Sequence, residues 1–228
     1  WSKRRLVVRR LLEGVHAAHA SEEPFVPSIR HATLFFRERK KNRGMSFVLR
    51  PRHVYRYGDG GENDHGWGCV YRNVQTVLDA LGVDPVPRVA AMRRALGIAP
   101  SDRLVEMWIE PPDAQRLIRD AAGRDFGLLG FPDRRSVERI SMRHAADVFR
   151  VVGDRATLDA AIRSSLQRTA VPILIDDGVA SYLILGWRRG DPGDDDFVLG
   201  DPHVQQNNAR RMRADDFFSK SWMLLIPT

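Results

Sequence analysis

The sequence predicts an α+β protein, and three observations support this fold class. Residues 69–81 (CVYRNVQTVLDAL) place apolar side chains at the spacing of one helix face. The predicted helices fall mostly before residue 170, whereas apolar, strand-like segments dominate from residue 171 onwards. Helices and strands do not alternate regularly, which argues against repeated βαβ units and a parallel sheet.

The composition is typical of a globular protein. The chain has 228 residues, 43% hydrophobic content and a formal charge of +7, which excludes an intrinsically disordered chain. A single cysteine excludes an internal disulfide framework and a multi-cysteine zinc site. No apolar run approaches the ~20 residues that span a bilayer, and residues 1–12 lack a secretory h-region. We therefore expect a cytoplasmic (or nuclear) location.

The positive charge lies at the N-terminal end. Residues 1–50 contain 12 of the 36 lysines and arginines but only four of the 29 acidic residues, so the rest of the chain is close to neutral. We predict a basic N-terminal extension over residues 1–45 and one folded domain over residues 46–228. The extension suits an acidic partner. No aromatic platform is interleaved with its charges, so we do not expect nucleic-acid binding.

The first part of the chain contains four predicted elements before a long loop. Apolar residues recur at helical spacing in 3–19, two prolines mark 21–30 as a connector, and the short apolar runs at 32–36 and 46–50 indicate strands. A charged turn at 37–44 joins these strands. The loop that follows, 57–66, contains four glycines and leads directly into the helix at 69–81.

Three more helices and four strands are predicted in the rest of the chain. Helices are expected at 87–96, at 112–122 and at 155–168, and Pro112 suits the first turn of the second helix. Apolar runs then predict four strands, at 171–175, 180–187, 196–200 and 221–226. The segment 190–196 is rich in Asp and Gly, so we expect a turn between the second and third of these strands.

Cys69 is the candidate nucleophile. It lies where the glycine-rich loop turns into the helix, and a helix N-terminus stabilises a thiolate through free N–H groups and the macrodipole. Its backbone N–H can also bind a developing oxyanion. Gly66 and Gly68, on either side of Trp67, allow another backbone to approach closely. A lone cysteine is more often a small buried hydrophobe, so its position alone leaves both interpretations open.

A nucleophilic cysteine needs a base, and His203 is the best candidate. It follows Asp201-Pro202 directly after an apolar strand, and side chains two residues apart in extended chain share a side, so Asp201 can orient the imidazole. An ordinary turn after a strand is the alternative. His53 and His65 are the next candidates. No histidine or cysteine pair has a metal-ligand spacing, so we expect no metal and no cofactor.

Residues 66–75 (GWGCVYRNVQ) resemble the nucleophile motif G-W-G-C-x-Y-R-x-x-Q of the ubiquitin-fold-modifier-specific proteases (UFSP). The resemblance covers about residues 50–226 and includes the segments YRYG at 55–58, VP at 171–172, GV at 178–179, ILG at 184–186 and DPH at 201–203. It implies a papain-like cysteine protease fold, with the catalytic helix packed against a mainly antiparallel sheet. It also implies thiol-mediated cleavage after the C-terminal glycine of a ubiquitin-like modifier, in precursor processing or in release from lysine.

The resemblance also implies roles for individual residues. Cys69 would be the nucleophile, His203 the general base and acid, Asp201 its orienting partner, and Tyr57 the hydroxyl that completes the oxyanion hole. Substrate binding is expected at three further residues that would form a narrow slot for a glycine tail: Trp67, Gly68 and Gly178. Arg72 and Gln75 are expected to tie the catalytic loop to the body by hydrogen bonds.

Several features favour related families or functions. The autophagins share G-W-G-C and D-P-H, often with a glutamine where Gln206 stands. The zinc-finger relatives that act on ubiquitin chains share the motif up to Asn73 but take their histidine from near position 181, where this chain has Ser181. Asp176 and Asp177 replace glycines that are usual in the UFSP family, and we expect them to favour basic substrates. A binding module that does not cleave, and a nucleic-acid or membrane adaptor, also stay open.

Overall fold

The computed structural model describes residues 46–189, 195–204 and 209–228. The predicted basic extension, with its helix at 3–19, connector at 21–30, strand at 32–36 and charged turn at 37–44, lies outside the described residues. Gln206 and most of the turn expected at 190–196 lie outside them as well. The described part of the fold and of the site begins at Ser46.

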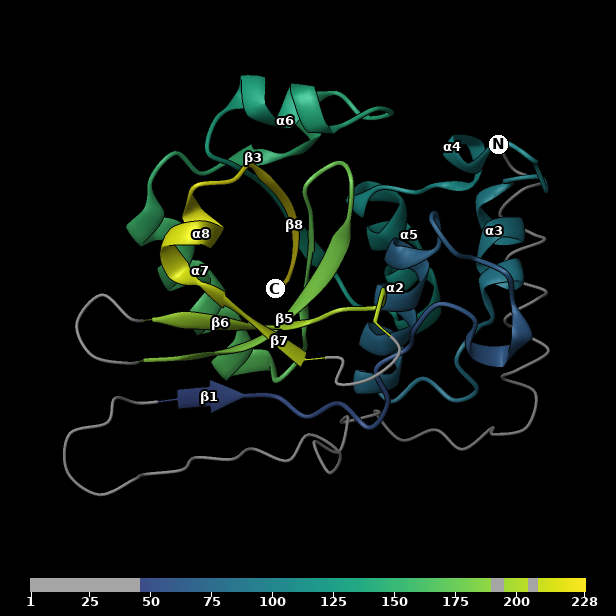
Figure 1. Ribbon diagram of the computed structural model, residues 1–228, viewed down its shortest axis with the longest axis horizontal. Helices are drawn as coiled ribbons and strands as arrows, with labels where there is room; N and C mark the ends of the chain where they lie inside the picture. Colours follow the sequence, from purple (N-terminus) through teal and green to yellow (C-terminus); the bar gives the residue numbers. More distant parts are fainter. Residues whose placement is uncertain (1–45, 190–194, 205–208) are drawn as a thin grey trace.

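One sheet forms the centre of the molecule (Figure 1), and its described strands follow the order β3-β2-β8-β4-β5-β6-β7, with β1 paired to β5. The described pairs are antiparallel apart from β2 with β3. The strands are β1 (Ser46–Val48), β2 (Phe126–Phe131), β3 (Arg150–Val151), β4 (Ile173–Asp176), β5 (Ser181–Arg188), β6 (Asp196–Gly200), β7 (Ala209–Arg213) and β8 (Trp222–Pro227).

Helices cover both faces of this sheet, as Figure 1 shows. The described helices are α2 (Cys69–Ala80), α3 (Val89–Leu96), α4 (Leu104–Met107), α5 (Pro111–Ala122), α6 (Arg134–Ile140), α7 (Arg155–Thr169) and α8 (Ala214–Phe218), with short 3-10 turns η1 (Asp59–Gly61) and η2 (Ala146–Val148). Among them, no helix combines the length and the apolar character needed to cross a membrane.

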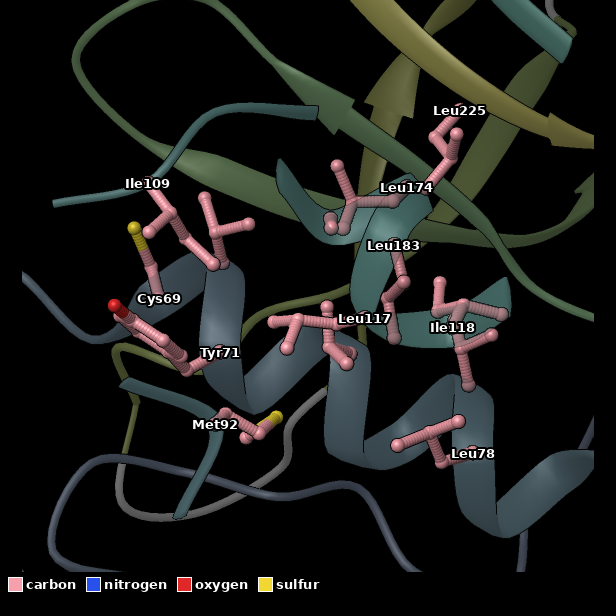
Figure 2. Packing of buried hydrophobic residues seen from close by; sticks show 14 of the residues in the cluster. Cys69, Tyr71, Leu78, Met92, Ile109, Leu117, Ile118, Leu174, Leu183 and Leu225 are labelled. Carbon is pink, nitrogen blue, oxygen red and sulfur yellow. The ribbon is translucent and has the colours of Figure 1, made fainter. Parts of the chain in front are cut away.

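Side-chain alternation along the central strands separates two cores. Leu174 of β4 and Leu225 of β8 pack with α2 and α5, and Figure 2 shows them beside residues of these helices. Ile173 and Ile175, the neighbours of Leu174, belong instead to the core beneath α7. Successive residues of a strand point to opposite faces, so a strand covered on both sides must be apolar throughout. This explains the uninterrupted apolar runs in β4 and β8.

The predicted α+β class is confirmed, and most predicted elements exist. The helices expected at 69–81, 87–96, 112–122 and 155–168 are α2, α3, α5 and α7, and the expected strands at 46–50, 171–175, 180–187, 196–200 and 221–226 are β1, β4, β5, β6 and β8. The sequence did not reveal β2, which lies next to β8 and precedes α7, so the expected separation of early helices from late strands is only partly right.

Candidate active site

Cys69 is the first residue of α2, and its side chain is 2% exposed. Figure 2 shows it at the start of the helix, in the same buried cluster as Leu78 near the other end. The helix begins here because Gly68 leaves helical geometry while its carbonyl accepts the Arg72 backbone N–H at 3.0 Å. The candidate nucleophile is therefore held by the hydrophobic core.

A buried ion pair fixes the loop before Cys69. The Arg72 guanidinium donates to both carboxylate oxygens of Asp64, from Nε at 2.6 Å and from Nη2 at 3.0 Å. Arg72 also donates to Gln75 Oε1 at 2.9 Å, and Gln75 donates to the Pro87 carbonyl at 2.8 Å. The expected role of Arg72 and Gln75, in tying the loop to the body, agrees with these contacts.

The three residues expected to bind substrate each have a partner inside the protein. A side chain on Gly68 would collide with Asp64, and a side chain on Gly178 would meet the Ile140 carbonyl oxygen at 2.6 Å. Trp67 is buried and lies edge-on to Tyr71, with ring centroids 5.8 Å apart. Internal packing is thus enough to explain why these residues stand here, and their role in binding stays a prediction.

Asp201 and His203 form the second part of the site, directly after β6. His203 Nδ1 lies 2.6 Å from Asp201 Oδ1, and the same oxygen accepts the His203 backbone N–H at 2.9 Å. Burial acts to raise the pKa of Asp201, but the hydrogen bonds from His203 outweigh it and the pKa lies below its ordinary value. The carboxylate is therefore ionised and can hold Nδ1 of the imidazole protonated.

Tyr57 lies between the two parts. Its backbone N–H donates to the Pro202 carbonyl at 3.1 Å, and its ring meets the His203 ring edge-on, with centroids 5.1 Å apart. Its hydroxyl hydrogen-bonds to the Cys69 thiol. Burial, and then the neighbouring Cys69, raise the pKa of Tyr57 well above its ordinary value, so the phenol stays protonated as a donor.

The surroundings of Cys69 favour the protonated thiol. Burial is the largest cause, and the nearby Asp176 carboxylate adds to it, so the pKa of Cys69 rises to about 12. Hydrogen bonds from the Ser181 and Val70 backbone N–H groups and from the Tyr57 hydroxyl act in the opposite direction. Desolvation of the buried sulfur outweighs these donors, so it opposes the thiolate that we expect from the helix N-terminus.

Asp176 and Asp177 do not form one acidic surface. Asp176 ends β4, is fully buried and accepts the Gly178 backbone N–H at 2.7 Å, while its Oδ2 has no hydrogen-bond partner among the described residues. Asp177 instead accepts the Ala180 backbone N–H at 2.9 Å and lies 3.9 Å from Lys220 Nζ. Because Asp176 is buried, a substrate side chain does not contact it directly, and the expected preference for basic substrates stays a prediction.

Of the runner-up histidines, His53 pairs with another carboxylate, and His65 pairs with none within the described residues. His53 Nε2 contacts Asp59 Oδ2 at 3.1 Å, and His65 is exposed, with its ring 5.2 Å from that of Tyr57. Within the described ranges, no group of three or more His, Cys, Asp or Glu side chains is arranged to hold a metal ion. The described contacts therefore bring Cys69, Tyr57, Asp201 and His203 together, with Tyr57 touching both parts.

Sequence reasoning missed Asp64 and the role of Ser181. Asp64 lies in a loop whose sequence indicates only turn residues. The available signal is Arg72, since a guanidinium near the buried start of a helix requires a carboxylate partner. Ser181 contacts Cys69 through its backbone N–H and accepts from Asn73 Nδ2 at 2.9 Å. Position 181 thus lies beside the nucleophile, where a histidine would serve as base and a serine does not.

Known proteins were compared with the chain by sequence and by structure. The sequence model of Peptidase family C78 matches residues 44–223. A comparison with curated proteins gave no match. The crystal structure of UfSP from C. elegans aligns with a TM-score of 0.54 and 17% sequence identity, over 93% of this chain and 36% of that chain. The likeness confirms the expected papain-like α+β fold, and the chain spans well under two thirds of the length of that protein.

Proposed function

The chain belongs to peptidase family C78, a family of cysteine peptidases, and from this premise we propose that it is a thiol protease that cleaves after the C-terminal glycine of a ubiquitin-like modifier. The observation that carries the proposal is the position of Tyr57, whose hydroxyl bonds the Cys69 thiol while its ring lies against His203. One side chain thus links the candidate nucleophile to the candidate base.

The proposed reaction starts from the neutral thiol. His203 takes the proton of Cys69 as the sulfur attacks the carbonyl carbon of the terminal glycine, and Tyr57 and the Cys69 backbone N–H stabilise the oxyanion. The C–N bond then breaks, and the imidazolium returns its proton to the leaving amine. Water, deprotonated by His203, hydrolyses the thioester. Asp201 holds the imidazole with Nδ1 protonated, so that Nε2 is free to accept.

The substrate class follows from the family resemblance. We propose the ubiquitin-fold modifier as the preferred partner, either as a precursor or attached to lysine, because the GWGCVYR motif and the D-P-H arrangement match UFSP. Ser181 beside Cys69 counts against the arrangement of the zinc-finger relatives, whose base comes from this position. The autophagin-like function depends on Gln206, outside the described residues, and cleavage of the matching modifier would support it.

The test uses modifier probes that carry an electrophile in place of the C-terminal carboxylate. We expect the ubiquitin-fold-modifier probe to add one modifier mass to the intact chain, and Cys69→Ser to abolish the adduct. Probes made from ubiquitin and from the autophagy modifier test the deubiquitinase-like and autophagin-like functions. Binding of an unmodified modifier without turnover or labelling would indicate a non-cleaving module and contradict the proposal.

Two further expectations stay proposals. The protein would act in the cytoplasm or nucleus, which fluorescence imaging of the tagged full chain tests. The domain would begin near residue 46, with residues 1–45 as a basic extension that contacts an acidic partner. If the domain does begin near residue 46, removing residues 1–45 should leave probe labelling intact. Loss of labelling in a variant that still folds would contradict it.

A further inference from the structure

The second oxygen of the Asp201 carboxylate faces an arginine from another strand. Oδ1 of Asp201 is used twice by His203, whereas Oδ2 lies 3.6 Å from Arg210 Nη1. The Asp201 side chain is 6% exposed and that of Arg210 is 42% exposed. An ion pair in which the carboxylate is buried is screened less than a surface pair. Arg210 is therefore placed to hold the carboxylate from the side opposite to the imidazole.

Arg210 also contacts the aromatic ring beside the imidazole. Its guanidinium carbon lies 4.3 Å from the centroid of the Tyr182 ring. Tyr182 in turn packs on His203, with ring centroids 5.4 Å apart and an interplanar angle of 56°. Tyr57 also meets His203 edge-on, so the imidazole contacts two tyrosine rings. Arg210 contacts one of these rings and also the carboxylate that orients the imidazole.

Strand pairing explains how Arg210 reaches this point. In the β6–β7 pair, Arg210 is opposite Leu199, two residues before Asp201, and Arg211 is opposite Val198. Consecutive strand residues point to opposite faces, and the contacts follow this rule. Arg210 reaches Asp201 and Tyr182, while Arg211 Nη1 lies 3.8 Å from Asp196 Oδ2. The strand thus offers one arginine directed to the candidate site and a matched one directed away from it.

We propose that Arg210 is a positioning residue that fixes the His203 imidazole through Asp201 and Tyr182. The proposal rests on the proposed peptidase function. An imidazole held by a carboxylate alone can rotate about its Nδ1–H hydrogen bond, and a ring that packs against it and is itself held by a guanidinium restricts this freedom. Arginine suits the task because its planar fork serves the carboxylate and the aromatic face at once, which lysine cannot do.

The kinetic test compares Arg210→Ala, Arg210→Lys and Arg211→Ala on a fluorogenic amide of the ubiquitin-fold modifier. We expect kcat of Arg210→Ala to fall by about 10-fold to 100-fold with KM unchanged, since misplacing a catalytic group costs about this much. Arg210→Lys should recover part of the loss by restoring the charge. Arg211→Ala should match the wild type. Equal kcat values for Arg210→Ala and Arg211→Ala, or a change in KM alone, would overturn the proposal.

An NMR test decides the proposal even if no modifier is cleaved. The proton between His203 Nδ1 and Asp201 Oδ1 should give a downfield resonance that exchanges slowly with water in the full chain. We expect it to broaden in Arg210→Ala but not in Arg211→Ala, with thermal melts confirming that both variants are folded. If Arg210→Ala does not fold, Arg210→Gln replaces it. A resonance unaffected by loss of the guanidinium would refute the positioning role, whereas a failed probe panel would refute only the proposed function.

Discussion

The two parts of the candidate site are held in different ways. The Cys69 part is built into the core: the residue is 2% exposed, and the loop before it is fixed by the buried Arg72–Asp64 pair. The His203 part stands at the end of a strand, with a side chain that is 29% exposed and rests on one carboxylate and two aromatic rings. The nucleophile is immobilised by burial, and the base by a few polar and aromatic contacts.

Because the two parts are held differently, they contribute differently to the stability of the protein and to the rate of the reaction. Burial keeps the sulfur in place but raises the pKa of Cys69, so the cost of immobilising the nucleophile is a neutral thiol that needs a base. A partly exposed imidazole suits that task, because it can accept and release protons. We therefore expect changes on the Cys69 side to lower the free energy of unfolding, and changes on the His203 side to lower the rate.

The largest effect should come from Asp201→Asn. An asparagine side chain can bind Nδ1 as a donor and place the proton on Nε2, so the imidazole could no longer take the thiol proton. We expect kcat on a modifier substrate to fall by about 10³-fold to 10⁴-fold with little change in the melting temperature. The control is Asp196→Asn, at the other end of β6, which pairs with Arg211. Similar kcat losses in both variants would break the comparison.

The matching change on the nucleophile side is Arg72→Ala. It leaves the Asp64 carboxylate buried without its cation, which costs about 3–5 kcal/mol of unfolding free energy. Urea denaturation measures the loss. Arg103→Ala removes an exposed i,i+3 pair with Glu106 and should cost less than about 1 kcal/mol. If Arg72→Ala costs no more than Arg103→Ala, the core does not hold the loop as the structure indicates.

A third prediction concerns Asp176, the buried acid near the thiol. Burial raises its pKa to about 7 from an ordinary value of 3.8, so the folded protein keeps a proton that the unfolded chain releases in this range. Stability is therefore lost as the pH rises towards about 7. Relative to the wild type, Asp176→Asn should gain about 2–3 kcal/mol of stability between about pH 5 and about pH 8.

Urea denaturation at the two pH values measures this gain. Asp177→Asn, one residue along and accessible to solvent beside Lys220, is the matched control and should show a much smaller change. A relative stability of Asp176→Asn that does not depend on pH would mean that Asp176 is ionised in the folded protein throughout the range.

The smallest expected effect is on the reactivity of the free thiol. Because the pKa of Cys69 is about 12, alkylation by iodoacetamide should accelerate with pH without a plateau up to about pH 10. Tyr57→Phe removes a hydrogen bond that favours the thiolate, so alkylation should slow by about fivefold, the equivalent of about 1 kcal/mol. Intact mass measures the rate, and Tyr55→Phe is the control. A plateau near neutral pH would indicate a thiolate–imidazolium pair and contradict the neutral thiol.

The elements that could be predicted are those whose residues carry a complete local pattern. Helix α2 has a complete apolar face, β8 is apolar throughout, and β4 is apolar up to its last residue, because both faces of the sheet are covered. Strand β2 (FGLLGF) was missed because its two glycines resemble a loop. One of them, Gly130, is required because a side chain there would collide with Val137 of α6. That requirement comes from a contact between two elements, which no single segment shows.

Contacts between separate segments also limit what the sequence predicts of the site. The motif around Cys69 and the Asp201-Pro202-His203 segment are readable because each is a short run of neighbouring residues. Asp64 and Arg210 act through contacts with residues eight or more positions away, and their local sequence resembles an ordinary turn and an ordinary charged strand. The raised pKa of the thiol was not predicted for a related reason, since the burial of Cys69 depends on how the whole domain packs around it.

Strand β7 ends the sheet in the part of the chain that the structure describes. An edge strand leaves backbone groups open to pairing with another molecule, and charged side chains along it discourage such aggregation. Three of the five residues of β7, Arg210, Arg211 and Arg213, are arginines. The strand therefore also protects solubility, so an engineer who neutralised it to tune activity would risk making the protein self-associate.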